Sequence, residues 1–228
     1  MSPALAHILY WLTAYLIGAI PFGWIFVKIK TGRDIRYIAS GRMGMSNVTR
    51  VAGKFWGILT AVMDVVKGIA AIHVARLFAA EPEPWMLTVG GILAVLGHIY
   101  SIFMIERRRD KRFYFRGGAG GLTSAGVSVA LWIGFLYFMP IPCFLIYQFT
   151  GYASVTVALF NVFGLIAFIV GALTGQCSWW YCLYSIVAEI LVLDSLRPNF
   201  KRLRRGDERK SSLTFRKKKE DQEKNKKD

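Results

Sequence analysis

The polar segment at residues 40–50 carries side chains suited to binding an anion, in a chain that is otherwise rich in apolar residues. Its two glycines permit tight backbone turns, while Ser40 and Asn47 offer hydrogen bonds. Arg50 offers a planar fork of N–H donors, which matches the geometry of a phosphate group. Together these residue types indicate a site for a phosphorylated ligand.

A second polar segment, Arg116–Gly121, is rich in glycine and precedes an apolar stretch that begins near Leu122. Glycines there let backbone N–H groups approach an anion, and the N-terminus of the following helix adds the positive end of its dipole. A glycine-rich loop between two spans is also often a simple turn. Besides Arg116, the candidate anion-binding residues of this segment are Gly117, Gly118, Gly120 and Gly121.

A third segment, Arg197–Leu203, follows the last apolar stretch and contains Asn199 and Lys201. Basic residues beside a span often only set its orientation, so any one of the three segments alone is weak evidence for a site. All three, however, are expected on the same face of a membrane. Their convergence favours an anionic ligand at the cytoplasmic interface, and a lipid phosphate is the natural candidate.

Three of the ionisable residues inside the apolar stretches are candidates for a role in the site. Asp64 and Lys67 are three positions apart and can pair along one face of a helix. An isolated charge in a span costs roughly 2.5–3.5 kcal/mol, so we expect the two to pair, either as a structural tie or with a direct functional role. His98 could accept a proton during catalysis or could be a hydrogen-bonding core histidine, and the second role is the commoner one.

Composition indicates that these segments are positioned by a membrane-embedded body. Of the 228 residues, 54% are hydrophobic and only 19% are charged, whereas a soluble domain usually carries about a quarter charged residues. Repeated apolar stretches have about the length needed to cross the hydrocarbon of a bilayer. We therefore predict an all-α, polytopic helix bundle, which excludes a wholly disordered, collagenous or disulfide-stapled secreted protein.

The predicted spans number about seven, with the N-terminus outside and the C-terminus in the cytoplasm. The loop at 28–54 carries a net charge of +6 and the loop at 106–121 one of +4, so both should be cytoplasmic. The basic tail should also be cytoplasmic, so an even number of spans must lie between Gly121 and the tail. The last two apolar stretches supply two of them. The stretch 122–149, with Pro140 inside it, is therefore predicted to form two more. The other spans are Ala4–Val27, Phe55–Phe78, Trp85–Ile105, Val155–Thr174 and Trp179–Leu193.

The chain divides into a membrane domain at 1–203 and a basic tail at 204–228, which has too few apolar residues to fold alone. The net charge of +15 could suggest nucleic-acid binding, but the basic residues cluster beside apolar spans, which is typical of contact with anionic lipid. We therefore expect membrane lipids, and no nucleic acid, as partners. The three cysteines have no zinc-like spacing, so we interpret them as packing residues and infer no metal or redox site from them.

Several spaced motifs resemble the bacterial acyl-phosphate:glycerol-3-phosphate acyltransferases, the PlsY family. The matching motifs are Gly18–Gly23, Ser40-Gly41, Asn47–Arg50, Asp64–Gly68, Gly97-His98, the glycine loop and Asn199–Leu203. The resemblance implies an enzyme of the bacterial inner membrane, active in phospholipid synthesis. Such an enzyme moves an acyl group from acyl phosphate to the first hydroxyl of glycerol-3-phosphate and forms lysophosphatidic acid, and the family uses no metal or nucleotide cofactor.

By position, the resemblance implies roles for individual residues. Ser40, Asn47 and Arg50 correspond to the first site motif of the family, in which the arginine binds phosphate. Arg116 and the four loop glycines correspond to its phosphate loop, and Asn199 corresponds to the site asparagine of its last motif. We predict Lys201, beside that asparagine, as a further phosphate-binding residue.

This sequence departs from the family pattern at several of these positions. The usual Lys-Gly-Gly-Lys-Gly loop has Arg116 and Ala119 in the two lysine positions, and Leu196 stands where a site histidine is usual. Arg42 replaces the asparagine of the usual Ser-Gly-Asn. Losing an ammonium beside a phosphoryl group removes several kcal/mol of charge stabilisation, which Arg42 or a basic residue of 107–112 could restore.

Three hypotheses follow from the sequence. The leading one is an active acyltransferase with a rearranged anion site, in which His98 or a phosphate oxygen of a substrate accepts the hydroxyl proton. The second is a lipid-binding or regulatory family member that has lost activity through Ala119 and Leu196. The third is a membrane transporter or scaffold, which the absence of internal repeats disfavours. The sequence leaves the oligomeric state open.

Overall fold

The computed structural model describes residues 2–107 and 113–208, and almost all regular structure within these ranges is helical. The α-helices are α1 (Pro3–Ala19), α2 (Phe22–Thr31), α3 (Met45–Ala52), α4 (Lys54–His73), α5 (Pro84–Ile99), α6 (Gly121–Leu131), α7 (Phe135–Phe138), α8 (Pro140–Thr150), α9 (Ala153–Leu173) and α10 (Trp180–Arg204). Three short 3₁₀ turns, η1 (Ile35–Tyr37), η2 (Val74–Leu77) and η3 (Ile102–Met104), lie in the connections. The predicted all-α class is confirmed.

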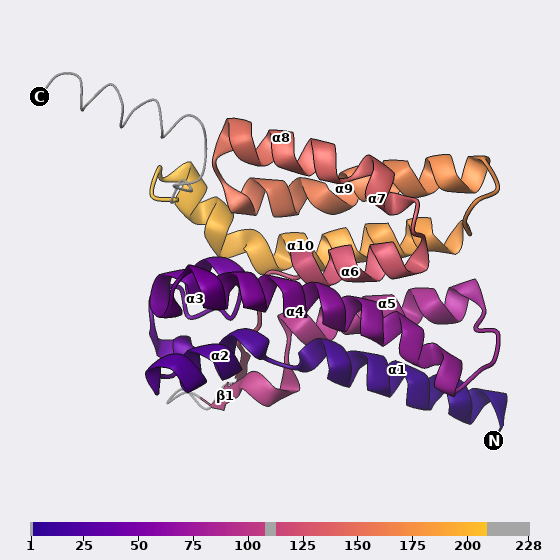
Figure 1. Cartoon of the computed structure of the whole chain (residues 1–228), viewed down its shortest axis with the longest axis horizontal. Coiled ribbons are helices and arrows are strands. Elements are labelled where there is room, and N and C mark those ends of the chain that lie inside the picture. Colours follow the sequence, from indigo (N-terminus) through magenta and orange to yellow (C-terminus); the bar gives the residue numbers. More distant parts are fainter. Residues whose placement is uncertain (1, 108–112, 209–228) are drawn as a thin grey trace, which may run out of the picture.

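The long helices lie side by side with their axes along the long dimension of the molecule (Figure 1). Helices α1, α4 and α5 form one part of the bundle, and α6 and α10 separate them from α8 and α9. The short helices α2 and α3 and the C-terminal end of α10 all gather at the end of the bundle opposite the N-terminus. All three polar segments are therefore positioned at one end of the bundle.

Four helical stretches are long and apolar enough to cross a membrane, namely Pro3–Thr31, Lys54–Leu77, Pro84–Met104 and Ala153–Leu173. Shorter apolar helices occupy Gly121–Leu131 and Phe135–Thr150. Large apolar side chains also point outward, as Ile8 and Leu12 do on α1, where they are more than half exposed. An outward apolar face of this kind fits contact with lipid. The count of seven spans and their orientation stay predictions.

The stretch at 122–149 divides into two helical parts as predicted, but the break is not at the prolines. Helix α6 ends at Leu131, and the chain turns at residues 132–134 before α7 begins. Pro140 occupies the first turn of α8, where its missing N–H leaves no hydrogen bond unmade. The prolines therefore start a helix rather than separate two spans.

Two other predicted spans also differ in the structure. The span predicted at Ala4–Val27 is interrupted at Ile20-Pro21, because proline cannot donate the hydrogen bond that would continue α1. The span predicted at Trp85–Ile105 ends as a helix at Ile99. After η3, the chain forms the antiparallel hairpin of β1 (Ile105–Arg107) and β2 (Phe113–Phe115), with Glu106 opposite Tyr114.

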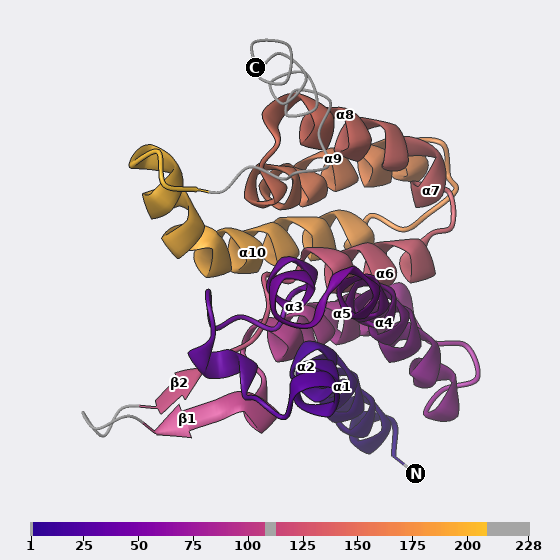
Figure 2. The ribbon, with the colours of Figure 1, turned by 60° about the vertical axis from the view of Figure 1, so that its left-hand side comes forward.

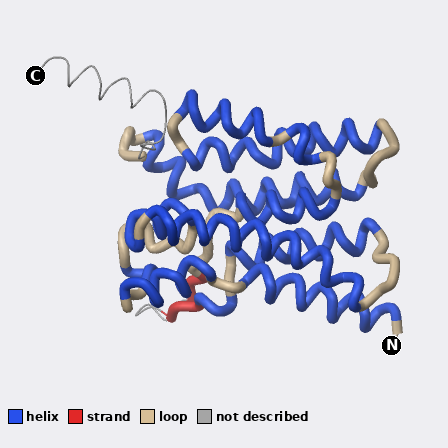
Figure 3. The backbone as a smooth tube through the Cα atoms, viewed as in Figure 1, coloured by secondary structure: helices blue, strands red, loops and turns tan. Residues whose placement is uncertain are grey.

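The sequence analysis did not anticipate this hairpin. It holds the only strands among the described residues (Figure 3) and projects from the bundle beside the short helices (Figure 2). Three-residue strands give too few alternating positions for the period of two to be recognised. The pairing extends one residue beyond the two strands, since the N–H of Arg116 donates to the carbonyl of Met104 at 3.3 Å.

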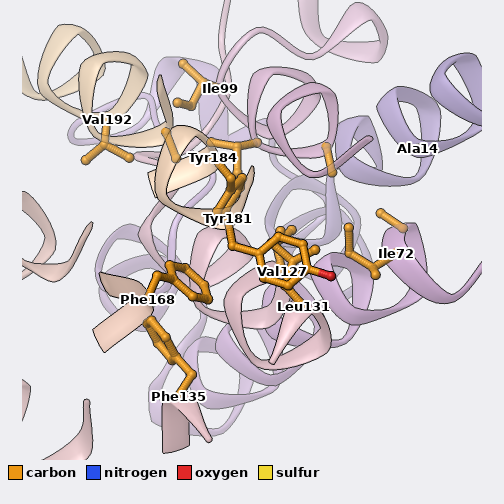
Figure 4. Close-up of a cluster of buried hydrophobic side chains, with 14 of the residues drawn as sticks. Ala14, Ile72, Ile99, Val127, Leu131, Phe135, Phe168, Tyr181, Tyr184 and Val192 are labelled. Carbon is orange, nitrogen blue, oxygen red and sulfur yellow. The ribbon is translucent and has the colours of Figure 1, made fainter. Parts of the chain in front are cut away.

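The main core lies between the long helices and is built on aromatic side chains. Phe135 and Phe168 lie 5.4 Å apart between their ring centroids, and Phe168 also packs edge-on against Tyr184 (Figure 4). Elsewhere the helices approach closely through small residues. A side chain at Gly18 would collide with the backbone of α5, so this glycine lets α1 and α5 cross at short range.

A smaller core supports the polar end of the bundle. It consists of buried side chains from α2, α3, η3 and the segments that connect them, namely Val27, Ile35, Met43, Val48 and Met104. These residues anchor the segment at 40–50 from beneath, which leaves Ser40 and Arg50 exposed on the outer side. The position of the first candidate segment is thus fixed by apolar packing rather than by the loop alone.

Candidate active site

Asn47 holds the first polar segment in shape. Its side chain is 3% exposed and donates from Nδ2 to the carbonyls of Arg42 at 2.9 Å and Ile38 at 3.3 Å. Its Oδ1 accepts the backbone N–H of Ser40 at 3.4 Å and the guanidinium of Arg50 at 3.5 Å. The amide therefore preorganises the loop, while Ser40 and Arg50 remain exposed at its surface.

The glycine loop is seated on the C-terminal end of α5. The N–H of Gly118 donates to the carbonyl of His98 at 3.1 Å, and a side chain at Gly117 would collide with the carbonyls of His98 and Ile99. Gly120 has φ +91°, a left-handed conformation that favours glycine, and directly precedes α6. The prediction that α6 begins at the end of this loop is confirmed.

Arg116 joins the glycine loop to the first segment. Its Nε lies 2.8 Å from Oε2 of Glu106 on the hairpin, and its NH1 donates to the carbonyl of Arg36 at 3.0 Å. Gly41, with φ +69°, lies directly against the same guanidinium, so a side chain there would displace it. This cation is therefore already paired with a carboxylate before any ligand binds.

Arg42 joins all three polar segments. Its NH1 donates to Oδ1 of Asn199 at 2.8 Å, and its NH2 contacts the carbonyl of Ser195. The hydroxyl of Ser195 in turn donates to the carbonyl of Ala119 in the glycine loop at 3.0 Å. Burial lowers the pKa of Arg42, and nearby Arg202 lowers it further while Glu208 opposes this. A guanidinium nevertheless stays charged at neutral pH, so Arg42 provides a fixed cation where the segments meet.

The sequence analysis missed Glu208 and Ser154, which support Asn199. Oε1 of Glu208 accepts Nδ2 of Asn199 at 2.8 Å and the hydroxyl of Ser154 at 3.2 Å, and its Oε2 accepts Nε of Arg202 at 2.9 Å. Burial raises the pKa of Glu208, but the hydrogen bonds from Asn199 and Arg202 outweigh this and lower it overall. Asn199 is thus fixed at both ends of its amide, by Arg42 and by Glu208.

Comparison with known proteins identifies the family. The profile described as "Glycerol-3-phosphate acyltransferase" matches residues 8–206. The chain belongs to the glycerol-3-phosphate acyltransferase family. It is 32% identical over 203 residues to the glycerol-3-phosphate acyltransferase of Lawsonia intracellularis, covering 88% of this chain and 94% of that protein. It is 35% identical over 204 residues to the enzyme of that name from Rubrobacter xylanophilus, covering 90% of this chain and 94% of that protein.

Two similar solved structures are forms of PlsY, an integral membrane glycerol 3-phosphate acyltransferase. The glycerol 3-phosphate form has a TM-score of 0.77 and 29% identity, covering 91% of this chain and 96% of that one. The lysophosphatidic acid form has a TM-score of 0.71 and 28% identity, covering 90% of this chain and 94% of that one. The predicted PlsY family, acyltransferase class, place in phospholipid synthesis and multi-pass membrane architecture are confirmed.

Two departures from the family pattern can now be placed. Leu196, in the position of the family histidine, is 2% exposed and packs in the main core. Ala119, in the position of the second family lysine, is half-buried and contributes its carbonyl to Ser195. Neither position presents a polar side chain. The guanidinium of Arg42 contacts the carbonyl of Ser195, which directly precedes Leu196 and whose hydroxyl donates to the carbonyl of Ala119.

The ionisable residues predicted inside the membrane come together beneath the glycine loop. Nζ of Lys67 lies 2.9 Å from Oδ1 of Asp64, and Nδ1 of His98 lies 3.5 Å from the same oxygen. All three side chains are almost fully buried. The predicted Asp64–Lys67 pair is present in the structure, whereas the role of each residue stays a prediction.

Lys201 lies apart from this arrangement. It is exposed in the last turn of α10, and among the described residues no side-chain hydrogen bond or ion pair joins it to Arg42, Asn199 or the glycine loop. The predicted tail at 204–228 is described only to Glu208, which folds back on Asn199, and the remainder from 209 lies outside the described residues. The ordered site thus extends slightly past the predicted domain boundary at 203.

Proposed function

We propose that this protein transfers an acyl group from acyl phosphate to the primary hydroxyl of glycerol-3-phosphate in a bacterial inner membrane, and so makes lysophosphatidic acid. The observation that carries the proposal is the meeting of the three predicted anion-binding segments at Arg42, through Asn199 and Ser195. Membership of a family with this activity supports it, as do similar structures named for their glycerol 3-phosphate and lysophosphatidic acid forms.

The two phosphates would be held by different parts of the site. Arg50 is exposed, and among the described residues its one side-chain hydrogen bond is the long contact to Asn47, so most of its donors are available to glycerol-3-phosphate. Ser40 and Asn199 would orient this acceptor. The backbone N–H groups of the glycine loop and the N-terminus of α6 would hold the acyl phosphate.

The chemistry asks mainly for positioning and anion stabilisation. The hydroxyl oxygen attacks the acyl carbon, the bond from that carbon to the phosphate oxygen breaks, and inorganic phosphate leaves with the bonding electrons. Because acyl phosphate already has a good leaving group, a fixed cation that stabilises the developing charge supplies much of what remains. We assign this role to Arg42, in place of the lysine that Ala119 replaces.

The hydroxyl proton passes, in this proposal, to a phosphate oxygen of a substrate. His98 is 3% exposed and packs beneath Gly118, so its imidazole lies under the glycine loop rather than on the surface where Ser40 and Arg50 are exposed. The hypothesis that His98 accepts this proton stays untested. Leu196 is then a tolerated departure, since no side-chain base is required at its position.

The experiment is lysophosphatidic acid formation by the purified protein in lipid, with glycerol-3-phosphate and either palmitoyl phosphate or palmitoyl coenzyme A. Turnover with palmitoyl phosphate alone is the expected result. Arg50→Ala should abolish turnover while the protein remains folded in the membrane. Arg33→Ala removes an exposed arginine from the same basic loop and should leave turnover unchanged.

Each contrary result points to a defined alternative. Turnover only with palmitoyl coenzyme A would refute the proposed donor. Unchanged activity in Arg50→Ala would remove Arg50 from the site. No turnover with either donor, from folded wild-type protein, would favour a lipid-binding family member without activity.

A further inference from the structure

The interruption between α1 and α2 releases backbone carbonyls inside the bundle. Because α1 ends at Ala19, the carbonyls of Ala19 and Ile20 lack the N–H donors that a continuing helix would supply, and Ile20 accepts only the N–H of Phe22 from the backbone bonds described, at 3.2 Å. Side chains from two other segments supply them. The hydroxyl of Ser101 donates to Ala19 at 2.6 Å, and Nζ of Lys67 donates to Ile20 at 3.0 Å.

Lys67 is tied to this break by more than one contact. Its ammonium lies 5.8 Å from the ring centroid of Phe22, the first residue of α2, and 2.9 Å from Oδ1 of Asp64. The side chains of Lys67 and Asp64 are 2% and 4% exposed. Breaking a buried pair leaves an uncompensated charge, so the two residues hold one another as well as the interrupted helix.

His98 connects this pair to the glycine loop. Nδ1 of its imidazole lies 3.5 Å from Oδ1 of Asp64 and has no hydrogen-bond partner among the described residues. Its other ring nitrogen, Nε2, lies directly beneath Gly118, where even a methyl group would collide with it. The backbone carbonyl of His98 accepts the N–H of Gly118 as well. Both the side chain and the backbone of His98 therefore form the floor of the loop.

Helix α4 contacts α6, the helix that follows the glycine loop, through the residue after Lys67. Gly68 packs against the backbone of Thr123 and Gly126 on α6, so closely that a side chain would collide with them. Helix α6 starts where the glycine loop ends. The segment of α4 that carries Asp64 and Lys67 thus touches the loop's floor at His98 and the helix that follows the loop.

We propose that Asp64, Lys67 and His98 act as positioning residues that set the height and orientation of the glycine loop for its anionic ligand. None of the three touches substrate in this proposal. It rests on the proposed function, in which the loop holds acyl phosphate. The chemical class of the ligand is an acyl phosphate monoanion or dianion, held by backbone N–H groups whose positions depend on the imidazole below them.

The test compares His98→Ala with His73→Ala in the full-length protein in lipid. His73 is an exposed histidine at the other end of α4 and belongs to no part of the site. Because misplacing a bound group by about 1 Å costs up to about a hundredfold in rate, we expect His98→Ala to raise the KM for palmitoyl phosphate about tenfold or more. The KM for glycerol-3-phosphate should change less than about twofold, and His73→Ala should match the wild type.

The pattern of kinetic constants separates positioning from other roles. A fall in kcat with both KM values unchanged would overturn the proposal, since it is the result expected of a proton acceptor. Unchanged kinetics in His98→Ala would overturn it too. His98→Gln, which refills part of the space below Gly118, should recover part of the lost apparent affinity for palmitoyl phosphate.

The buried pair is tested with Lys67→Met, Asp64→Asn and the double variant. Each single variant leaves one partner of the buried pair without its opposite charge. We expect the rise in KM for palmitoyl phosphate to be largest in Lys67→Met and smaller in the double variant than in that single variant. A double variant whose loss equals the product of the single losses would show that the pair does not act as a unit, and would overturn its part in the proposal.

A binding measurement distinguishes failure of this inference from failure of the proposed function. Palmitoyl phosphonate, which cannot transfer its acyl group, is titrated onto wild type, His98→Ala and His73→Ala. Wild-type binding without turnover would refute the activity and leave the positioning test intact. Phosphonate affinity equal in all three proteins would overturn the positioning role, and no binding to the wild type would overturn both.

Discussion

Arg42 and Asn199, which are 157 positions apart in sequence, meet at 2.8 Å between the guanidinium NH1 and the amide Oδ1. The contact connects the loop before α3 to the C-terminal part of α10. The same guanidinium reaches the carbonyl of Ser195, which is linked to Ala119 in the glycine loop. A cation at this junction can act on a ligand held by any of the three segments.

The first prediction concerns that cation. Arg42→Asn restores the residue usual in the family but removes the charge, so we expect a loss of about a hundredfold in kcat/KM for palmitoyl phosphate, the lower range for removing one donor to a developing charge. Arg42→Lys keeps the charge without the fork and should lose less. The assay is lysophosphatidic acid formation in lipid. Equal or higher activity of Arg42→Asn would show that Arg42 does not compensate for the missing lysine.

The second prediction concerns the glycine loop. Ala119→Lys restores a family lysine beside the proposed acyl phosphate site, so activity should be kept or should rise. The combination Arg42→Asn with Ala119→Lys should recover part of what Arg42→Asn loses, because each variant places a cation near the same phosphate. A combined variant whose activity equals the product of the two separate effects would indicate that the two positions serve different groups.

Much of this arrangement could be predicted because hydropathy and motif spacing act over short ranges. Apolar stretches predicted the helices, and the charged loops predicted that the polar segments lie at one end of the bundle, whereas the anion that they bind stays a prediction. Asp64 and Lys67 could be paired because three positions bring them to one helix face, and the structure places them 2.9 Å apart. These inferences needed no knowledge of the tertiary fold.

The rest depends on contacts between segments far apart in the chain. Composition places Glu208 in a charged tail, yet it accepts hydrogen bonds from Asn199, Arg202 and Ser154. An acidic residue just after a glycine that ends a basic helix is the one local signal, because it can turn back onto that helix. The place of His98 could not be predicted from its local sequence either, because only its contact with Gly118 shows that the imidazole lies under the loop.

The third prediction is a pH dependence set by Glu208. Its pKa is lowered below the ordinary 4.5, so its stabilising contribution is present above about pH 4.5 and is lost as the pH falls through the lower value of the folded protein. Glu208→Gln should lower the thermal unfolding temperature at pH 7. The difference from the wild type should shrink near pH 4 and below.

Asp207→Asn is the matched control for this experiment. Asp207 is the preceding residue, is exposed and forms no ion pair among the described residues, so its replacement should leave the unfolding temperature near that of the wild type. A difference between Glu208→Gln and the wild type that is constant from pH 7 to pH 4 would contradict an origin in the carboxylate charge. Activity measured at pH 7 should also fall in Glu208→Gln, because Asn199 loses its fixed orientation.

The fourth prediction tests the contact between Gly118 and His98 from the side of the glycine. Gly118→Ala places a methyl group against Nε2 of the imidazole, so the loop or the ring must move. We expect a loss of at least about tenfold in kcat/KM for palmitoyl phosphate, since displacement of the loop misplaces the bound phosphate. The measurement is steady-state turnover in lipid, with folded protein confirmed by its unfolding temperature.

The double variant Gly118→Ala with His98→Ala makes this prediction specific. Removing the imidazole also removes the atom with which the new methyl group collides, so the double variant should be no less active than His98→Ala alone. If the loss in the double variant equals the product of the two single losses, the effect of Gly118→Ala does not come from the imidazole. It would then come from the hydrogen bond between the N–H of residue 118 and the carbonyl of His98, or from reduced flexibility of the loop. A double variant that is as active as His98→Ala alone would show that the loop rests on the imidazole. This conclusion does not depend on which group accepts the proton.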